Sequence, residues 1–354
     1  MTHQENAPLS VTPGAIRFNT DSMKLEYFRI GSEGGSTSSY AGIGTLAAGE
    51  WVQITTDSPD IQTGGTRGII PGGFTTAAVT ETDYININST ANALDFGDLT
   101  TARGFASASA SRTRGIVAGG EPATANIELL TIASTGSFAN FGSLTDTSNY
   151  GSGLANSTRG LHNLGSVNPI RTDRIDYLTI ASTGTAQDFG NLTAVTNENS
   201  SCQSSTRGIF FGGRDASLFT KIDFVTISTL GNAADFGDLQ NLAEQGGGSS
   251  NSIRGLYAGK EAPAVSNVIE YITIATLGNS QDFGDLTVAR NQLGGVASPT
   301  RCCWAGGINN PSLKNEIDYV QIMSTGNAID FGDIQSNKRR NCPQGISNGH
   351  GGLG

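Results

Sequence analysis

The tripeptide Asp-Phe-Gly is the first feature of this sequence that could carry chemistry. Its five copies begin at Asp95, Asp188, Asp235, Asp282 and Asp330. In protein kinases this tripeptide supplies a carboxylate to Mg²⁺, but only with a glycine-rich phosphate loop, a strand lysine and a His-Arg-Asp motif. Those companions are absent here. The regular copies therefore predict a structural element, in which the aspartate accepts backbone N–H groups at a turn and the phenylalanine packs between neighbouring repeats.

A recurring arginine is the second candidate. Its six copies are separated by 47, 45, 48, 47 and 47 residues: Arg67, Arg114, Arg159, Arg207, Arg254 and Arg301. Identical positions predict a ring of half-buried donors, each joining a strand to a carbonyl or to an acid. The candidate acids are the aspartates near the recurring phenylalanine or the strand acids Asp83, Glu128, Asp176, Asp223, Glu270 and Asp318. A cluster of arginines that faces a ligand is the alternative.

The sequence offers little for catalysis. Its histidines, His3, His162 and His350, are not spaced as a metal-binding pair, and no GxSxG, HExxH or P-loop motif occurs. We therefore expect no catalytic residue, no metal and no cofactor, and we expect His162 to be an ordinary packed side chain. An enzyme that cleaves glycans would need two carboxylates in one pocket.

Composition narrows the range of partners. The net charge of −10 argues against nucleic acid, because phosphate binding needs a basic surface. We expect no membrane insertion and no signal peptide, since no apolar segment is long enough to span a bilayer and the first residues lack an apolar core. The cysteines lack CxxC spacing, which favours free thiols in a protein made in a reducing cytoplasm; they are Cys202, Cys302, Cys303 and Cys342.

A phenylalanine keeps step with the arginine, at intervals of 45, 48, 47, 47 and 48: Phe96, Phe141, Phe189, Phe236, Phe283 and Phe331. Each unit reads as four short strands, one of small residues, one ending in a glycine turn, one with alternating isoleucines and one with the phenylalanine. A period of roughly 40–50 residues with four strands is typical of a β-propeller blade. The sequence predicts an all-β, six-bladed propeller, with a solenoid as the alternative.

The ends of the repeat region are complementary. The first unit begins at Thr66 without its small-residue strand, and residues 341–350 resemble that missing strand. The C-terminal strand should therefore complete the first blade and close the propeller. Residues 1–62 do not fit the repeat, but AIRFN, KLEYFRI and EWVQI read as three strands. We expect a small N-terminal β module at 1–62, a linker over 52–66 and a propeller at 63–354.

The loops after the glycine turns vary while the scaffold repeats, and loops on a rigid scaffold often carry recognition. Their aromatic and basic residues are candidates for binding, although solvated turns would also explain them. These residues are Phe74, Arg171, Arg174, Arg214, Phe219, Lys260 and Lys314.

The repeat resembles the kelch repeat over residues 66–350. The features in common are a double glycine after an apolar strand (Gly212-Gly213), an acid–aromatic pair (Asp223-Phe224) and an aromatic followed by leucine (Phe236 to Leu239). Phenylalanine stands where kelch repeats carry tryptophan, and the second copy, at 140–143, departs from the pattern. The full repeat also resembles proteins of marine tailed bacteriophages, especially cyanophages, and the N-terminal segment resembles parts of phage tail and fibre proteins.

These resemblances imply a non-enzymatic structural component of a phage virion, associated with the tail or tail fibre. The N-terminal module would bind other virion proteins, and the propeller would be displayed in multiple copies to recognise host-surface glycans or to decorate the particle. The implied location is the virion, after synthesis in the host cytoplasm. A glycan-degrading propeller enzyme and an intracellular kelch-type adaptor are the alternatives.

Overall fold

The computed structural model describes residues 15–19, 24–30, 49–53, 65–167, 169–261, 263–335 and 345–353. The chain separates into two compact units, Met1–Gln62 and Thr63–Gly354. The first contains a three-stranded antiparallel sheet of β1 (Ile16–Asn19), β2 (Lys24–Ile30) and β3 (Gly49–Gln53). The predicted turn at 20–22, most of the predicted linker, His3 and Cys342 lie outside the described residues.

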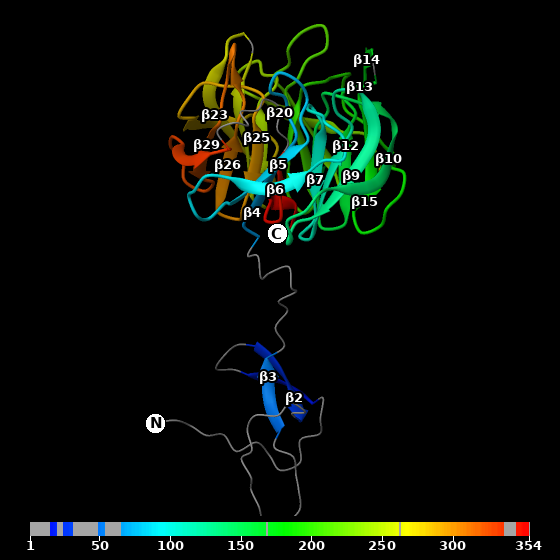
Figure 1. Cartoon of the computed structure of the whole chain (residues 1–354), viewed down its shortest axis with the longest axis vertical. Helices are drawn as coiled ribbons and strands as arrows, with labels where there is room; N and C mark the ends of the chain where they lie inside the picture. The colour runs from blue at the N-terminus through cyan, green and yellow to red at the C-terminus, as the bar shows by residue number, and fades with distance from the viewer. Residues whose placement is uncertain are drawn as a thin grey trace, which may run out of the picture. The chain divides into compact units, whose positions relative to one another are not determined.

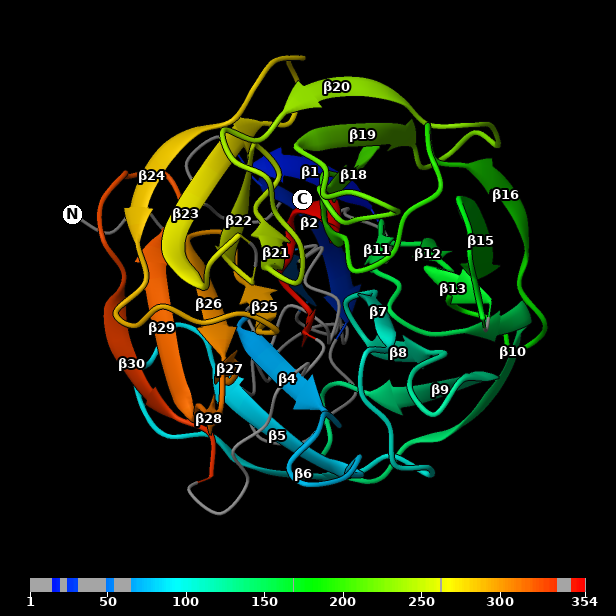
Figure 2. The same ribbon diagram turned by 90° about the horizontal axis from the view of Figure 1, so that it is seen from above.

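The second unit consists of six four-stranded antiparallel sheets, which we number as blades in chain order (Figures 1 and 2). Blade one contains β31 (Ile346–Ser347), β4 (Arg67–Pro71), β5 (Glu81–Asn86) and β6 (Leu94–Asp98). Blade two contains β7 (Ser107–Ala110), β8 (Arg114–Ala118), β9 (Thr124–Thr131) and β10 (Ala139–Ser148). Blade three contains β11 (Gly153–Ala155), β12 (Arg159–Asn163), β15 (Arg174–Thr179) and β16 (Gln187–Asn191).

The remaining blades repeat this order. Blade four contains β17 (Ser200–Gln203), β18 (Arg207–Phe211), β19 (Lys221–Thr226) and β20 (Ala234–Asp238). Blade five contains β21 (Gly247–Ser250), β22 (Arg254–Lys260), β23 (Ser266–Thr273) and β24 (Gln281–Asp285). Blade six contains β25 (Gly294–Ala297), β26 (Arg301–Ala305), β29 (Glu316–Gln321) and β30 (Ile329–Asp333). The prediction of an all-β, six-bladed propeller is confirmed.

Small side chains let the innermost strands approach one another around the axis (Figure 2). A Cβ atom on Gly248 of β21 would overlap the carbonyl oxygen of Ser201 on β17, and one on Gly295 of β25 would overlap the carbonyl oxygen of Gly248. Strand β31 occupies the innermost position of blade one, where Ile346 pairs with Ile69 of β4. Only backbones with little or no side chain can lie this close.

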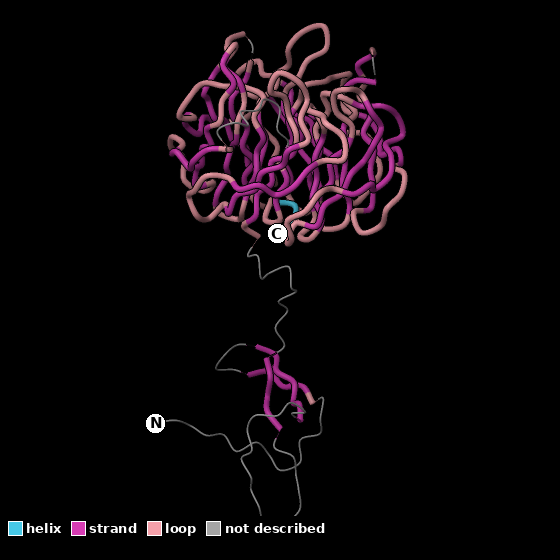
Figure 3. Tube along the Cα trace, viewed as in Figure 1, coloured by secondary structure: helices cyan, strands magenta, loops and turns pink. Residues whose placement is uncertain are grey.

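The residues after β31 lie inside the ring of innermost strands. Gly351–Leu353 form a short 3-10 turn, the helical segment that Figure 3 shows among the strands of the described chain. The His350 ring bonds through Nε2 to the carbonyl of Ala110, at 2.8 Å, and through Nδ1 to the side chain of Gln203, also at 2.8 Å. Ala110 and Gln203 are the last residues of the innermost strands β7 and β17, just before the turns that lead to Arg114 and Arg207. The C-terminal segment therefore lies at the end of the channel where the recurring arginines begin their strands.

The hydrophobic core is divided into clusters that lie between neighbouring blades. One cluster joins Leu161 and Phe189 of blade three to Phe210 and Val225 of blade four. The six recurring phenylalanines are all buried, with exposed fractions of 2 or 3%. They pack between neighbouring blades, as the sequence predicts.

The recurring arginines connect each blade to the next. In every copy Nη1 donates to a backbone carbonyl just after the third strand of the following blade; Arg254, for example, bonds to Ile322 O at 3.0 Å. Five of the six guanidinium groups also stack on an aromatic ring of their own blade, as Arg254 does on Tyr271 at 4.3 Å. The partners are therefore carbonyls and rings, and the alternative prediction of acidic partners is wrong.

The strand acids make a second connection between blades. Asp223 accepts the backbone N–H and the hydroxyl of Thr193, which follows the fourth strand of blade three, at 3.0 and 2.8 Å. Thr145 and Asp176 repeat this contact between blades two and three. The aspartates of Asp-Phe-Gly, such as Asp235, are exposed instead. The predicted role of accepting backbone N–H groups belongs to the strand acids instead. These acids lie on the third strand, which is buried and faces the preceding blade.

Two interfaces add a buried arginine to this contact. Arg290 Nη1 lies 2.9 Å from Asp318 Oδ2, both side chains are fully buried, and Nη2 donates to Trp304 O. Arg103 and Glu128 form the equivalent pair between blades one and two. A buried ion pair adds little net stability, but removing one partner leaves an uncompensated charge.

We expect Arg290→Met to lower the free energy of unfolding by about 3 to 5 kcal/mol, because Asp318 would stay buried without its cation. Urea denaturation measures this loss. Adding Asp318→Asn to the same chain should restore part of the stability, since it removes the unpaired charge. A single-variant loss below about 1 kcal/mol would contradict this reading of the pair.

Candidate functional site

All six second strands run from the arginine toward the glycine turn, so the loops that follow leave the same end of every blade. We call this end the loop face. The hairpin of β13 (Ser166–Val167) and β14 (Ile170–Arg171) lies there, at the top of Figure 1, and β27 (Ile308–Asn309) and β28 (Ser312–Leu313) form the corresponding hairpin of blade six. The C-terminal segment lies at the opposite end of the propeller (Figure 1).

Two of the predicted binding arginines connect neighbouring blades. Arg171 of blade three donates to the backbone carbonyl of Asp215 in blade four at 2.8 Å. Arg174 donates to the hydroxyl of Thr145 in blade two at 2.6 Å. Both side chains are 36% exposed, so each keeps part of its surface in solvent while it joins adjacent loops.

The other predicted residues are distributed around the loop face. Phe219 lies beneath a lysine at 5.3 Å, Lys260 donates to a backbone carbonyl at 3.3 Å, and Lys314 lies 3.9 Å from a glutamate of its own blade. Phe74 contacts the ring of Phe105, with 5.5 Å between the ring centroids. The seven predicted residues belong to blades one, three, four, five and six, and they do not form a single site.

A different set of residues surrounds the axis. In five blades the loop before the innermost strand contains a non-glycine residue with φ between 48° and 58°. These residues are Phe105, Tyr150, Glu198, Gln245 and Gln292, and we call them the rim. The backbone N–H of every rim residue after Phe105 donates to the backbone carbonyl of the preceding rim residue, at 3.0, 2.8, 2.9 and 2.6 Å in chain order. The corresponding residues of blade one, 341–344, lie outside the described part of the chain.

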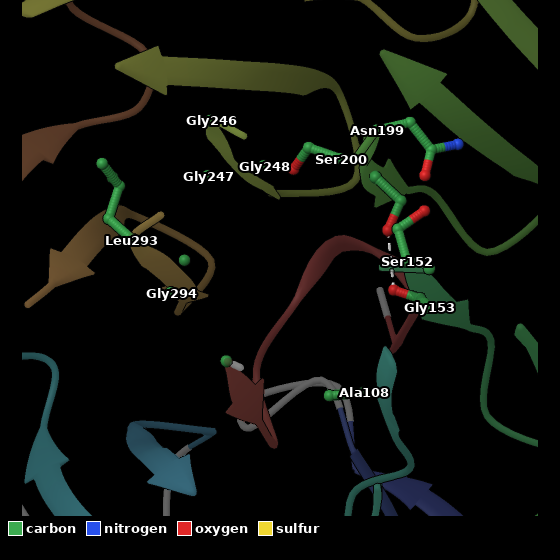
Figure 4. A pocket seen from close by; sticks show the side chains of 14 residues that line it. Ala108, Ser152, Gly153, Asn199, Ser200, Gly246, Gly247, Gly248, Leu293 and Gly294 are labelled. Atoms are coloured by element: carbon green, nitrogen blue, oxygen red, sulfur yellow. Dashed lines mark hydrogen bonds between the residues drawn. The ribbon is translucent and has the colours of Figure 1, made fainter. Parts of the chain in front are cut away.

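The rim encloses the mouth of a cavity of about 90 Å³ on the axis (Figure 4). Its lining includes the residue after four of the rim positions, namely Gly151, Asn199, Gly246 and Leu293. The hydroxyl of Ser152 and both amide atoms of Asn199 are buried in the wall behind this cavity, without a hydrogen-bond partner among the described residues. The residues that line the cavity are mostly glycine and serine, so backbone groups and hydroxyls form much of its surface.

A pair of carboxyl groups lies beside the rim. Glu244 is 3% exposed, and its burial, followed by the adjacent Glu198 carboxyl, raises its pKa to about 7. Arg214 Nη1 lies 3.4 Å from Glu244 Oε2 and opposes this shift.

The remaining candidates for chemistry are buried in the scaffold. His162 is completely buried between the hydroxyls of Ser107 and Ser109, at 2.7 and 3.1 Å, and burial lowers its pKa to about 3. The interpretation of His162 as a packed side chain is confirmed. The three described cysteines are buried free thiols, and burial raises the pKa of Cys302 to about 12.

No protein-family model matches this chain, and no curated protein matches it either.

Within the described residues, no three His, Cys, Asp or Glu side chains are grouped so that they could hold a metal ion. In the same part of the chain no helix has the length and apolarity needed to cross a bilayer.

The buried histidine should make stability depend on pH. Below its ordinary pKa of 6.5 His162 takes up a proton in the unfolded chain, but in the folded chain it stays neutral until about pH 3. Stability should therefore fall as the pH drops, and this one group should remove about 2 kcal/mol between pH 7 and 5. Urea denaturation at several pH values should give a shallower dependence for His162→Gln; parallel curves would contradict the assignment.

Glu244 should act in the opposite direction. Its pKa is raised from 4.5 to about 7, so between these values the folded chain binds more protons and stability falls as the pH rises. Glu244→Gln, which resembles the protonated acid, should raise the melting temperature at pH 8 and leave it nearly unchanged at pH 4.5. Glu261→Gln, at a nearby acid, is the matched control. An equal effect of Glu244→Gln at both pH values would refute this prediction.

Proposed function

We propose that this chain is a non-enzymatic structural component of a tailed-phage virion, associated with the tail or tail fibre. Its N-terminal unit binds other virion proteins, and its propeller is displayed to recognise host-surface glycans or to decorate the particle. The proposal rests on the kelch-like repeat, on the likeness of that repeat to cyanophage proteins and on the tail-like N-terminal segment. The structural observation that supports it most directly is the exposed apolar face of the N-terminal sheet.

This face is formed by alternate residues of β1. Ile16 and Phe18 are 65% and 53% exposed. Arg17 and Asn19, which alternate with them, point to the other side, where both bond to the buried carboxylate of Glu26, at 2.9 and 2.8 Å. The polar network therefore fixes the strand register, and it leaves the apolar side chains in solvent. A three-stranded sheet with this pattern gains stability when a partner covers it, as expected for an attachment module.

The propeller supplies the second half of the proposal. The contacts between its blades repeat in every copy, so the scaffold is rigid, whereas the loops and the rim differ from blade to blade. Several copies on one particle would strengthen weak binding to a surface, because each further contact forms at a high effective concentration. The buried thiols are compatible with synthesis in a reducing host cytoplasm.

Deleting residues 1–62 should remove the protein from purified particles while residues 63–354 keep their melting transition. The reason is that the deleted part is a separate compact unit, whereas the propeller core lies between its own blades. Immunoblotting of gradient-purified particles measures incorporation.

The full chain with Ile16→Ser and Phe18→Ser is the matched variant, which should be lost from particles in the same way. Normal incorporation of the deletion mutant would overturn the attachment role. A wild-type chain that stays in the soluble fraction would favour the intracellular adaptor.

A further inference from the structure

The end of the propeller opposite the loop face has an almost uncharged surface. We call it the arginine end, because the recurring arginines begin their strands there, at the bottom of the propeller in Figure 1. The turn from the third to the fourth strand of every blade lies at this end. These six turns contain no charged residue: 88–93, 133–138, 181–186, 228–233, 275–280 and 323–328. The three residues before each recurring arginine of blades two to six include one charged residue, Arg112, and no acid.

Four large apolar side chains stand on the surface of the arginine end. Leu230, Leu277 and Met323 lie in the turns that follow the third strands of blades four, five and six. Ile253 directly precedes the recurring arginine of blade five. All four side chains are between 51 and 58% exposed. Among the described residues of blades two and three, this end has no exposed large apolar side chain, so the four gather on one arc of the ring.

Hydrogen bonds connect the turns that carry these side chains. The carbonyl of Ile253 accepts the N–H of Ile274 at 2.9 Å, just before the turn that contains Leu277. The arginine that follows Ile253 donates to the carbonyl that directly precedes Met323, at 3.0 Å. Ile253 therefore lies between the turn of its own blade and the turn of blade six.

The fold does not require these apolar residues. Threonine occupies the position of Ile253 in all five other blades, and it occupies the position of Leu277 in blades one, two, three and six. Alanine stands in the place of Met323 in blades two, three and five. Because about half of each apolar side chain stays in solvent, its burial within the propeller contributes little to folding. Contact with a partner would remove the exposed half from water.

We propose that the arginine end of blades four to six binds a second copy of this chain, so that two propellers pack end to end about a two-fold axis. An interface of this kind must be self-complementary, because the same surface faces itself. Apolar side chains meet this requirement. The serine, threonine and asparagine residues around them meet it too, since each hydroxyl or amide group both donates and accepts hydrogen bonds.

The distribution of charge favours a second copy at this end. Two copies repel one another, because each chain has a net charge of −10. Exposed aspartates lie on the outermost strands, as Asp235 and Asp282 do, and on the loop face, as Asp146 and Asp215 do. The turns of the arginine end contain no acid, so two chains meet there with the least repulsion. Blade one, where the chain from the N-terminal unit enters, is not part of this surface.

Sedimentation velocity of the full chain over about 1 to 100 µM tests this assignment. We expect a dimer whose dissociation constant stays constant or falls when salt is raised, because salt screens the repulsion between two acidic chains. The double variant Ile253→Thr with Leu277→Thr carries residues that other blades have at these positions, so its melting temperature should match that of the wild type. Its dissociation constant should rise at least about tenfold, since each copy loses two apolar contacts.

Ile170→Thr, which removes an exposed isoleucine from the loop face, is the matched control and should dimerise as the wild type does. A wild-type chain that stays monomeric at about 100 µM would overturn the proposal, and so would a dimer that survives the double variant or dissociates when salt is raised. A monomeric wild type whose double variant is lost from particles would assign this surface to a virion protein instead. A dimer that is absent from purified particles would refute the proposed function and leave this interface standing.

Discussion

The contact on which this propeller depends is the one between an arginine of one blade and a backbone carbonyl of the next. The guanidinium group is planar, so it can stack on a ring of its own blade while its edge donates across the interface. Because the same contact recurs at every interface, it sets a similar angle between consecutive blades. The contact from Arg301 to Ile87 joins the sixth blade to the first at 3.4 Å.

The angle between blades determines what can occupy the axis. Six sheets turned about one line bring their innermost strands so close that glycine, alanine and serine predominate in them. The loops that enter these strands turn sharply, and their left-handed residues bond to one another around the mouth of the channel. The six innermost strands and the loops that enter them thereby enclose a polar cavity at the centre.

Much of the scaffold could be predicted from the sequence, because packing between blades imposes the same demand on every repeat. The regular spacing of residues such as Arg254 and Phe283 predicts that each repeat forms one blade. The first repeat lacks its innermost strand and the C-terminal segment resembles that strand, which predicts the pairing of β31 with β4. The partners of the strand acids could not be predicted, because the period does not show which neighbouring blade a side chain faces. Asp223 meets a threonine of the preceding blade, whereas the arginine of the same blade points to the following one.

The candidate site could not be predicted for a related reason. The charge of loop residues such as Arg171 suggests binding, but neighbouring loops already engage them. The rim residues recur at intervals of 45 to 48 residues, each just before a small-residue strand, so this period could reveal their positions. Their residue types do not repeat, so a search for repeated residue types does not find them. Variation between blades does not by itself mark a functional position, because a buried packing position also varies. Ile70, Val117 and Trp304 each pair with the strand acid of their own blade and are at most 1% exposed. What distinguishes the rim is that its varied side chains stand on left-handed backbone, where glycine would be less costly.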